Sequence, residues 1–262
     1  MSFVIPPLIK RNVILFALSQ SFTGAGMQFS YGFGPLMVMS LTGSASLAGV
    51  SVGMIGLSRF LVAYPMGKVT DTYGRKPGIL LGLVLAMIGT LMLGSAMIIR
   101  SIPLYIFGLL AFGMGMNGSQ QMRVGVADMF PPAFRARALG YVALGSLVGL
   151  ILSPAMVKLA DHIANETGAD PLGMPWFFLP VLILGGMAIV SFVHPDPKVI
   201  GSRLQDYWPD YQPAKASQSK SSEPFSSWRL MSNPSIRLAI LSNCAATGNM
   251  SIVMVLTSLV LQ

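Results

Sequence analysis

The sequence predicts an all-α, polytopic membrane protein from its composition and from the grouping of its apolar residues. Of the 262 residues, 53% are hydrophobic and only 10% are charged, whereas ordinary soluble domains have about 25% charged residues. So few charges cannot cover a water-exposed surface, which excludes the soluble and disordered classes. The apolar residues also gather in seven runs, each close to the roughly 20 residues that a helix needs to cross a bilayer.

The expected membrane helices follow one another with mostly short connections. In chain order they cover residues 13–39, 47–66, 78–99, 102–123, 139–158, 176–193 and 236–262. The chain carries no charge from Asn12 to Ser58, and a turn at 42–46 divides this stretch because it is too long for one helix. Asn233 and Pro234 provide a cap and a first-turn proline for the last helix. Glycines spaced four residues apart predict close helix contacts at 49/53, 78/82 and 145/149.

The basic residues are distributed unevenly between the two sets of connections. With the N-terminus inside, the outer connections hold only Arg100 and Lys158. The short inner connections hold seven: Lys10, Arg11, Lys68, Arg75, Lys76, Arg135 and Arg137. Because Lys and Arg accumulate on the cytoplasmic side, we expect the N-terminus inside, in a bacterial cytoplasmic (inner) membrane. The placement of these charges between apolar runs, with no basic helix, also argues against a nucleic-acid partner.

A polar segment separates the sixth expected helix from the seventh. Its middle, Tyr211 to Ser227, is rich in Ser, Pro and Lys, which is typical of a flexible linker. The predicted organisation is a six-helix transmembrane bundle over residues 1–193, a cytoplasmic interdomain linker over 194–233, and the first helix of an incomplete C-terminal bundle over 234–262.

The connection after the second helix carries the most specific motif. Residues 67–76 read GKVTDTYGRK, which resembles the G-x-x-x-D-R/K-x-G-R-R/K signature of the major facilitator superfamily of transporters. Thr72 stands where that family prefers a basic residue, and the motif closes on the basic pair Arg75 and Lys76. Six helices, an inner linker and a further helix also match the family. The resemblance implies a helical bundle with a 3+3 inverted repeat that transports by alternating access.

Each residue type in this motif has a physical reason. Gly67 would let the end of one helix lie close to its neighbour, and Gly74 can adopt positive φ in a tight turn. Asp71 is an acid among bases, and Arg75 suits bidentate pairing with it. The resemblance implies that Asp71 and Arg75 latch the two halves of a transporter in its outward-facing state. The alternative is a solvated basic loop that only sets topology.

The connection after the fourth helix is a second, related element. Residues 128–140 read DMFPPAFRARALG, which resembles the family's D-x-x-P-x-x-x-R-x-x-A element, the inverted-repeat counterpart of the first motif. Asp128 is therefore expected to join the charge network of Arg75. Arg135 occupies the basic position of this element.

Polar residues in the first and fourth helices are the candidate substrate contacts. The resemblance places these two helices around a central cavity near the bilayer midplane. Gln28 and Tyr31 share one face of the first helix, and Asn117 and Gln120 lie within one turn of the fourth. Amides in apolar helices must face protein or water, because lipid cannot satisfy them. They contact a substrate, or they form the interhelical hydrogen bonds that are common in membranes.

Arg59 lies well inside the second helix. A buried Arg is costly in a membrane and is usually functional. It could bind an anionic substrate or pair with an acid, including one from the missing half. Alternatively, its side chain snorkels toward the inner surface.

The resulting functional hypothesis is a secondary active or facilitative transporter that moves a small-molecule substrate. Its partners are the lipid bilayer and the missing C-terminal half, which belongs to the same chain if the sequence is truncated. The alternative is a non-transporting half-protein that acts as an assembly or interaction partner. One Cys and two His predict no metal site, no cofactor is expected, and no nucleophile–base pair or phosphate loop predicts an enzyme.

Overall fold

The computed structural model describes residues 5–209, 211 and 232–260, and every regular element in these ranges is a helix. In chain order these are α1 (Pro7–Thr42), η1 (Ala45–Leu47), α2 (Gly49–Tyr73), α3 (Arg75–Ile98), α4 (Ile102–Ser119), α5 (Gln121–Asp128), η2 (Pro132–Phe134), α6 (Arg135–Thr167), α7 (Met174–Ser191), α8 (Pro197–Ser202), α9 (Leu204–Tyr207) and α11 (Pro234–Val260). The all-α class predicted from the sequence is confirmed.

Five helical stretches within the described residues are long and apolar enough to cross a membrane. They are α2, α3, α4 together with α5, η2 together with α6, and α7. The first and seventh expected helices are also helical, as the 36-residue α1 and the 27-residue α11. The predicted start of the last helix is confirmed, because α11 begins at Pro234 and the Asn233 side chain accepts the Ser235 N–H at 3.0 Å.

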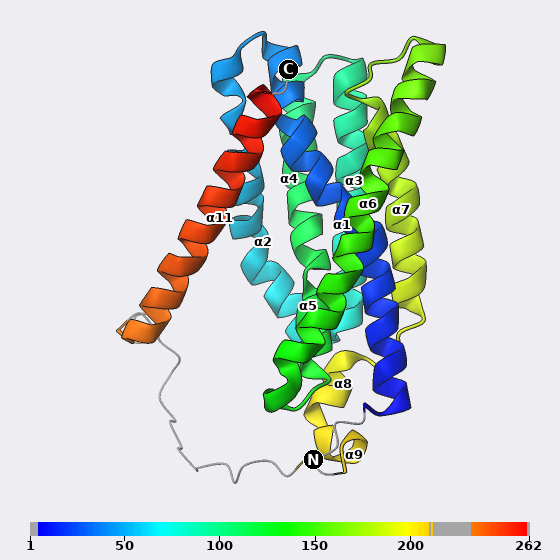
Figure 1. Ribbon diagram of the computed structural model, residues 1–262, viewed down its shortest axis with the longest axis vertical. Helices are drawn as coiled ribbons and strands as arrows, with labels where there is room; N and C mark the ends of the chain where they lie inside the picture. The colour runs from blue at the N-terminus through cyan, green and yellow to red at the C-terminus, as the bar shows by residue number, and fades with distance from the viewer. Residues whose placement is uncertain (1–4, 210, 212–231, 261–262) are drawn as a thin grey trace.

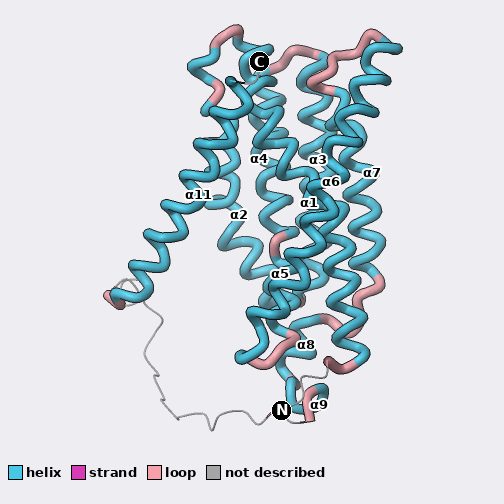
Figure 2. The backbone as a smooth tube through the Cα atoms, viewed as in Figure 1, coloured by secondary structure: helices cyan, strands magenta, loops and turns pink. Residues whose placement is uncertain are grey.

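The helices up to α7 stand side by side in one bundle (Figure 1). Apart from the one-residue break at Gln120 between α4 and α5, the connections of the bundle lie at its two ends (Figure 2). One end carries the α2–α3, α5–α6 and α7–α8 connections and the start of α1, and α8 and α9 lie across it. We call this the motif end. Helix α11 lies beside the bundle, where it contacts α1 and α2.

The packing order of the helices has an internal symmetry. The main helix pairs are α1 with α6, α2 with α4, α3 with α4, α1 with α7, and α3 with α7. Exchanging the first three spans (α1, α2, α3) with the second three (α4–α5, α6, α7) converts this set of pairs into itself. Helix α1 also leads away from the motif end, whereas α4 leads toward it. This is the arrangement that a 3+3 inverted repeat requires.

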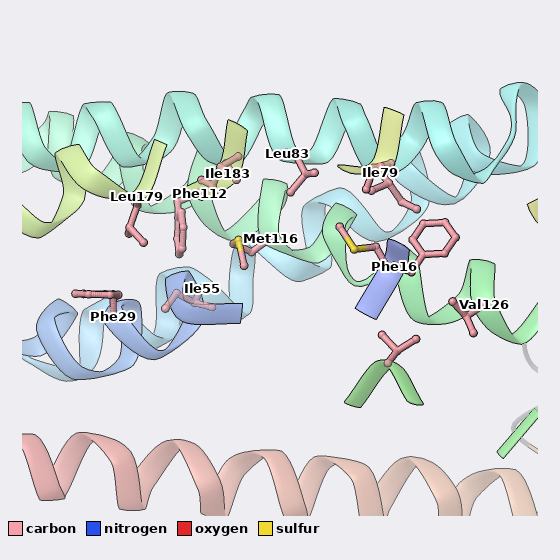
Figure 3. Close-up of a cluster of buried hydrophobic side chains, with 14 of the residues drawn as sticks. Phe16, Phe29, Ile55, Ile79, Leu83, Phe112, Met116, Val126, Leu179 and Ile183 are labelled. Carbon is pink, nitrogen blue, oxygen red and sulfur yellow. The ribbon is translucent and has the colours of Figure 1, made fainter. Parts of the chain in front are cut away.

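Apolar side chains from α1 to α8 form the core, and Figure 3 shows part of it. Phe16, Ile79, Leu83 and Phe112 are fully buried there. Glycines bring α3 and α4 close together, because a Cβ on Gly82 would lie 2.8 Å from Gly118 Cα. Such small-residue contacts are typical of membrane helices, which lack a hydrophobic drive to associate.

The predicted glycine pairs behave differently from one another. Gly78 and Gly145 have no room for a Cβ, since one would collide with Thr70 and with the Ala17 backbone, respectively. The spaces beside Gly49 and Gly53 are open in the described part of the chain. No close contact at 49/53 is found among the described residues.

Helix α6 is longer than expected. It runs through residues 159–167, which lie between the expected membrane helices 139–158 and 176–193, and ends where Gly168 adopts φ 69°. Its last turns are polar but form a helix. Within them, His162 Nε2 lies 3.4 Å from Glu166 Oε1, at i,i+4 spacing. Hydropathy predicts where a helix leaves the apolar region, and it does not predict where the helix ends.

Candidate functional site: a charge cluster at the motif end

Arg75, the first residue of α3, is the centre of a charge cluster at the motif end. Its Nε donates to Asp128 Oδ2 at 2.8 Å, and its Nη1 donates to Asp71 Oδ1 at 3.1 Å and to Thr70 Oγ1 at 3.0 Å. The Arg75 side chain is 18% exposed, Asp128 is 26% exposed and Asp71 is 73% exposed. The structure thus brings together the three charged residues expected to interact, and the Arg75–Asp128 pair is the more shielded from solvent.

The turn that presents Arg75 consists of Gly74 alone. Helix α2 ends at Tyr73 and α3 begins at Arg75, and Gly74 between them has φ 111°. This is a conformation that residues with a Cβ rarely adopt. A Cβ at Gly74 would also lie 2.6 Å from Asp196 Oδ2. The predicted positive φ is confirmed, and crowding provides a second reason for glycine.

Two other motif residues have partners different from those of Arg75. Lys76 donates from Nζ to the carbonyl oxygens of Ser191 at 2.6 Å and Val193 at 3.1 Å, where a cation suits the negative end of α7. Arg135 donates to the Phe130 carbonyl at 3.4 Å and stays outside the cluster. Gly67 has no atom within 4 Å of a Cβ position among the described residues, so the close helix approach predicted there is not found.

Residues 194–208, which we call the docking segment, complete the cluster and were expected to be linker. The Asp196 carboxylate accepts the backbone N–H groups of Arg75 at 3.1 Å and Lys76 at 2.9 Å. These are the first N–H groups of α3, which have no partner within their own helix. Asp196 also accepts the Lys198 N–H at 2.8 Å and so caps α8.

Residues that follow Asp196 make the other contacts of the docking segment. Lys198 Nζ donates to the carbonyl oxygen of Asp71, at the end of α2. Trp208 is buried, and its Nε1–H donates to the Met129 carbonyl at 3.1 Å. Its ring lies 5.4 Å from that of Phe130 and 6.4 Å from that of Phe134. Asp196 followed by Pro197 is a helix-start pattern, and this was the signal in the sequence that could have predicted α8.

The candidate substrate contacts lie deeper in the bundle. Arg59 Nη2 donates to the Tyr31 hydroxyl at 2.9 Å, so α1 and α2 bring these two residues together. Asn117 and Gln120 are half-buried, and no hydrogen bond joins either of them to Tyr31 or Arg59 in the described structure. The side chain of Gln28 lies outside the described residues.

Comparison with known proteins supplies the family. The model of the Major Facilitator Superfamily matches residues 16–262, which is most of the chain. The chain belongs to the major facilitator superfamily. Together with its apolar helices, this membership makes it an integral, multi-pass membrane protein.

Individual superfamily members resemble the chain over part of their length. It is 25% identical over 198 residues to the MFS-type transporter YddS of Bacillus subtilis (strain 168), covering 75% of this chain and 45% of that protein. It is 27% identical over 199 residues to YdeG of the same organism, covering 76% and 46%. It is 23% identical over 192 residues to the riboflavin transporter RfnT of Brucella anthropi, covering 72% and 47%. The chain spans about half the length of the superfamily relatives that it matches.

Proposed function

We propose that the chain is the N-terminal half of a transporter that moves a small solute across a membrane by alternating access. In this proposal α1 to α7 form one half, and α11 is the first helix of the second. The observation that carries the proposal is the bridge from Arg75 to Asp71 and Asp128, at one end of a bundle with inverted-repeat packing. Membership of the superfamily supports the same function.

The bridge suits a switch between two states. Arg75 is the first residue of the third span, and Asp128 is the last residue of the fourth. Their 2.8 Å contact therefore joins the two repeats of the half. An exposed ion pair contributes about 0–1 kcal/mol, whereas moving a two-state equilibrium from 1:99 to 99:1 takes about 5.5 kcal/mol. A partly exposed cluster therefore biases the equilibrium toward one state without locking it. In this proposal the cluster holds the outward-facing state and breaks on inward opening.

The proposed orientation puts the motif end on the cytoplasmic side of a bacterial inner membrane. The seven basic residues of the short inner connections, against two in the outer ones, support this orientation. Residues 194–233 then connect the two halves on the cytoplasmic side. The partners are a small solute, the bilayer and the second half.

Uptake measurements on cluster variants test this function. A solute is first selected by its ability to stabilise the purified full-length protein against heat, and its uptake into proteoliposomes is then measured. Asp71→Asn and Arg75→Ala should abolish or severely slow uptake while membrane insertion stays normal, since the two-state bias is lost. Arg100→Ala removes an exposed charge in the α3–α4 connection, which lies at the end of the bundle opposite the motif end, and is the matched control. Uptake at wild-type rates in both cluster variants would contradict the switch.

A further inference from the structure

Arg59 is a cation at depth in the bundle, and it has no anionic partner among the residues that the structure describes. At 1.5 Å per residue it lies about 15 Å from the start of α2 and about 21 Å from its end. The acidic residues within the described ranges lie in the last turns of α2, α5 and α6, in the α6–α7 connection and in the docking segment. None of them pairs with Arg59 there: Asp71, Asp128, Asp161, Glu166, Asp170, Asp196 and Asp206. Asp71, the acid of its own helix, is about 18 Å along the axis and is bound to Arg75.

A hydrogen bond to Tyr31 on the neighbouring helix α1 holds the Arg59 side chain at its own depth in the bundle. Tyr31 lies about 17 Å from the end of α1 that is remote from the motif end, which is nearly the level of Arg59. A snorkelling Arg would extend along α2 toward the motif end, but the guanidinium of Arg59 donates to the Tyr31 hydroxyl at its own depth. Snorkelling therefore does not explain the position of this side chain.

The pair has unused hydrogen-bonding capacity. A guanidinium carries five N–H donors, and in the described structure Arg59 uses one of them, on a Tyr31 oxygen that keeps its own proton to donate. Tyr31 is buried and Arg59 is half-buried, so the guanidinium is shielded but reachable. The two residues belong to α1 and α2, the helices that α11 contacts, and in the proposed function α11 is the first helix of the second half.

We propose that Arg59 and Tyr31 form an oxyanion-binding site, and that the transported solute carries a carboxylate or phosphate group. This inference rests on the proposed transport function. A planar guanidinium binds two oxygens of such a group side by side. The Tyr31 hydroxyl orients the guanidinium and donates to the same group. An uncharged solute would leave the charge of Arg59 uncompensated, which is costly at this depth.

The test uses matched pairs of anionic and neutral solutes on the purified full-length protein. The pairs are succinate and succinamide, benzoate and benzamide, and glycerol 3-phosphate and glycerol, with glucose as a further neutral solute. Thermal stability is measured across a concentration series of each, and uptake of every solute into proteoliposomes is measured in parallel. At least one anion should stabilise the protein where its neutral counterpart does not.

Variants of Arg59 and Tyr31 test whether these two residues cause the stabilisation by anions. Arg59→Gln should weaken apparent binding of the stabilising anion at least about tenfold, and Tyr31→Phe about three- to tenfold. Arg59→Lys should give an intermediate loss, because it keeps the charge and loses the planar fork. Arg100→Gln removes an exposed Arg at an end of the bundle and should bind like the wild type.

Three outcomes would overturn the inference, and they separate it from the proposed function. If Arg59→Gln responds to anions like the wild type, the pair is not the site; an ion pair between Arg59 and an acid of the second half predicts this result. If only neutral solutes stabilise the protein and are taken up, the oxyanion site fails while transport stands. If no solute stabilises the protein and none is taken up, both proposals fail.

Discussion

At the scale of single residues, Gly74 shows how one position determines the geometry of the cluster. It ends α2, starts α3 within one residue and leaves room for the Asp196 carboxylate. Two separate costs therefore fall on any replacement: the positive φ and the collision with Asp196. Gly168 shares only the first of these, because it has φ 69° with open space around it in the described structure.

Replacing Gly74 by alanine should destabilise the protein more than the same change at Gly168. We expect Gly74→Ala to cost about 2 kcal/mol or more, from strain and crowding together. Gly168→Ala should cost about 1 kcal/mol, from the backbone conformation alone. Thermal denaturation of the two detergent-solubilised variants measures the difference. Equal losses would show that Asp196 does not crowd this turn.

The meeting of Asp71, Arg75 and Asp128 was predictable from the sequence. The capping of α3 by Asp196 was not. Asp71, Arg75 and Asp128 lie in two motifs with recognisable spacing, so their meeting could be expected. Asp196 reaches Arg75 across 121 positions of the chain, and no local pattern encodes such a contact. The hydrogen bond between Arg59 and Tyr31 was likewise not expected, because it depends on how α1 and α2 are aligned.

At the scale of elements, the docking segment packs against the motif end and contacts both of its motif-bearing connections. Asp196 caps α3 and α8, while Trp208 binds the α5–α6 connection through Met129 and packs near Phe130 and Phe134. One short stretch therefore contacts both motif-bearing connections. Hydropathy predicted a linker here, because a segment that is polar overall gives no apolar run even when it folds.

Truncating Trp208 should release the docking segment. Trp208→Ala removes a buried ring and a hydrogen bond and should cost about 3 kcal/mol of local stability. Trp208→Phe keeps a ring and loses the N–H donor, which should cost about 1 kcal/mol. Limited trypsin digestion followed by mass spectrometry measures the rate of cleavage after Arg203. Cleavage of Trp208→Ala at the wild-type rate would contradict the docked arrangement.

Glycines determine how closely α3 and α4 pack. A Cβ on Gly115 would collide with the backbone of Ala86, and the collision cannot be relieved by rotating a side chain. Gly115→Val should therefore prevent stable folding, whereas Gly53→Val should be tolerated because the space beside Gly53 is open among the described residues. Size-exclusion profiles of fluorescently tagged variants measure the folded fraction. A monodisperse Gly115→Val peak would show that the two helices can separate without loss of the fold.

At the scale of the whole molecule, the fold class and the order of the helices followed from the sequence, while the helix ends did not. Composition predicts a membrane protein because the charge deficit belongs to the chain as a whole. The polar last turns of α6 were not predicted to be helical, because the helix continues there beyond its apolar part. The wide apolar exposure of α2, with Phe60 and Tyr64 each 79% exposed, agrees with a surface that lipid or a second half covers.

The proposed orientation is testable by cysteine labelling. Cys244 is the one cysteine of the 262 residues, so a Cys244→Ser background leaves no native thiol among them. Thr72→Cys, at the motif end, should react with a membrane-impermeant maleimide only in inside-out vesicles, and Arg100→Cys only in intact, right-side-out ones. Labelling of both from the same side would contradict the topology, and the reverse pattern would invert the orientation.

The unequal lengths of the helices have a consequence for the surrounding lipid. Helix α7 has 18 residues, about 27 Å, and this is slightly less than the roughly 30 Å of a typical hydrocarbon core. Helix α6 has 33 residues, about 50 Å. A short helix cannot tilt without losing its span, so α7 should stand nearest to the bilayer normal while longer helices incline around it. Hydrophobic mismatch at α7 would then make thin membranes the more favourable surroundings for this protein.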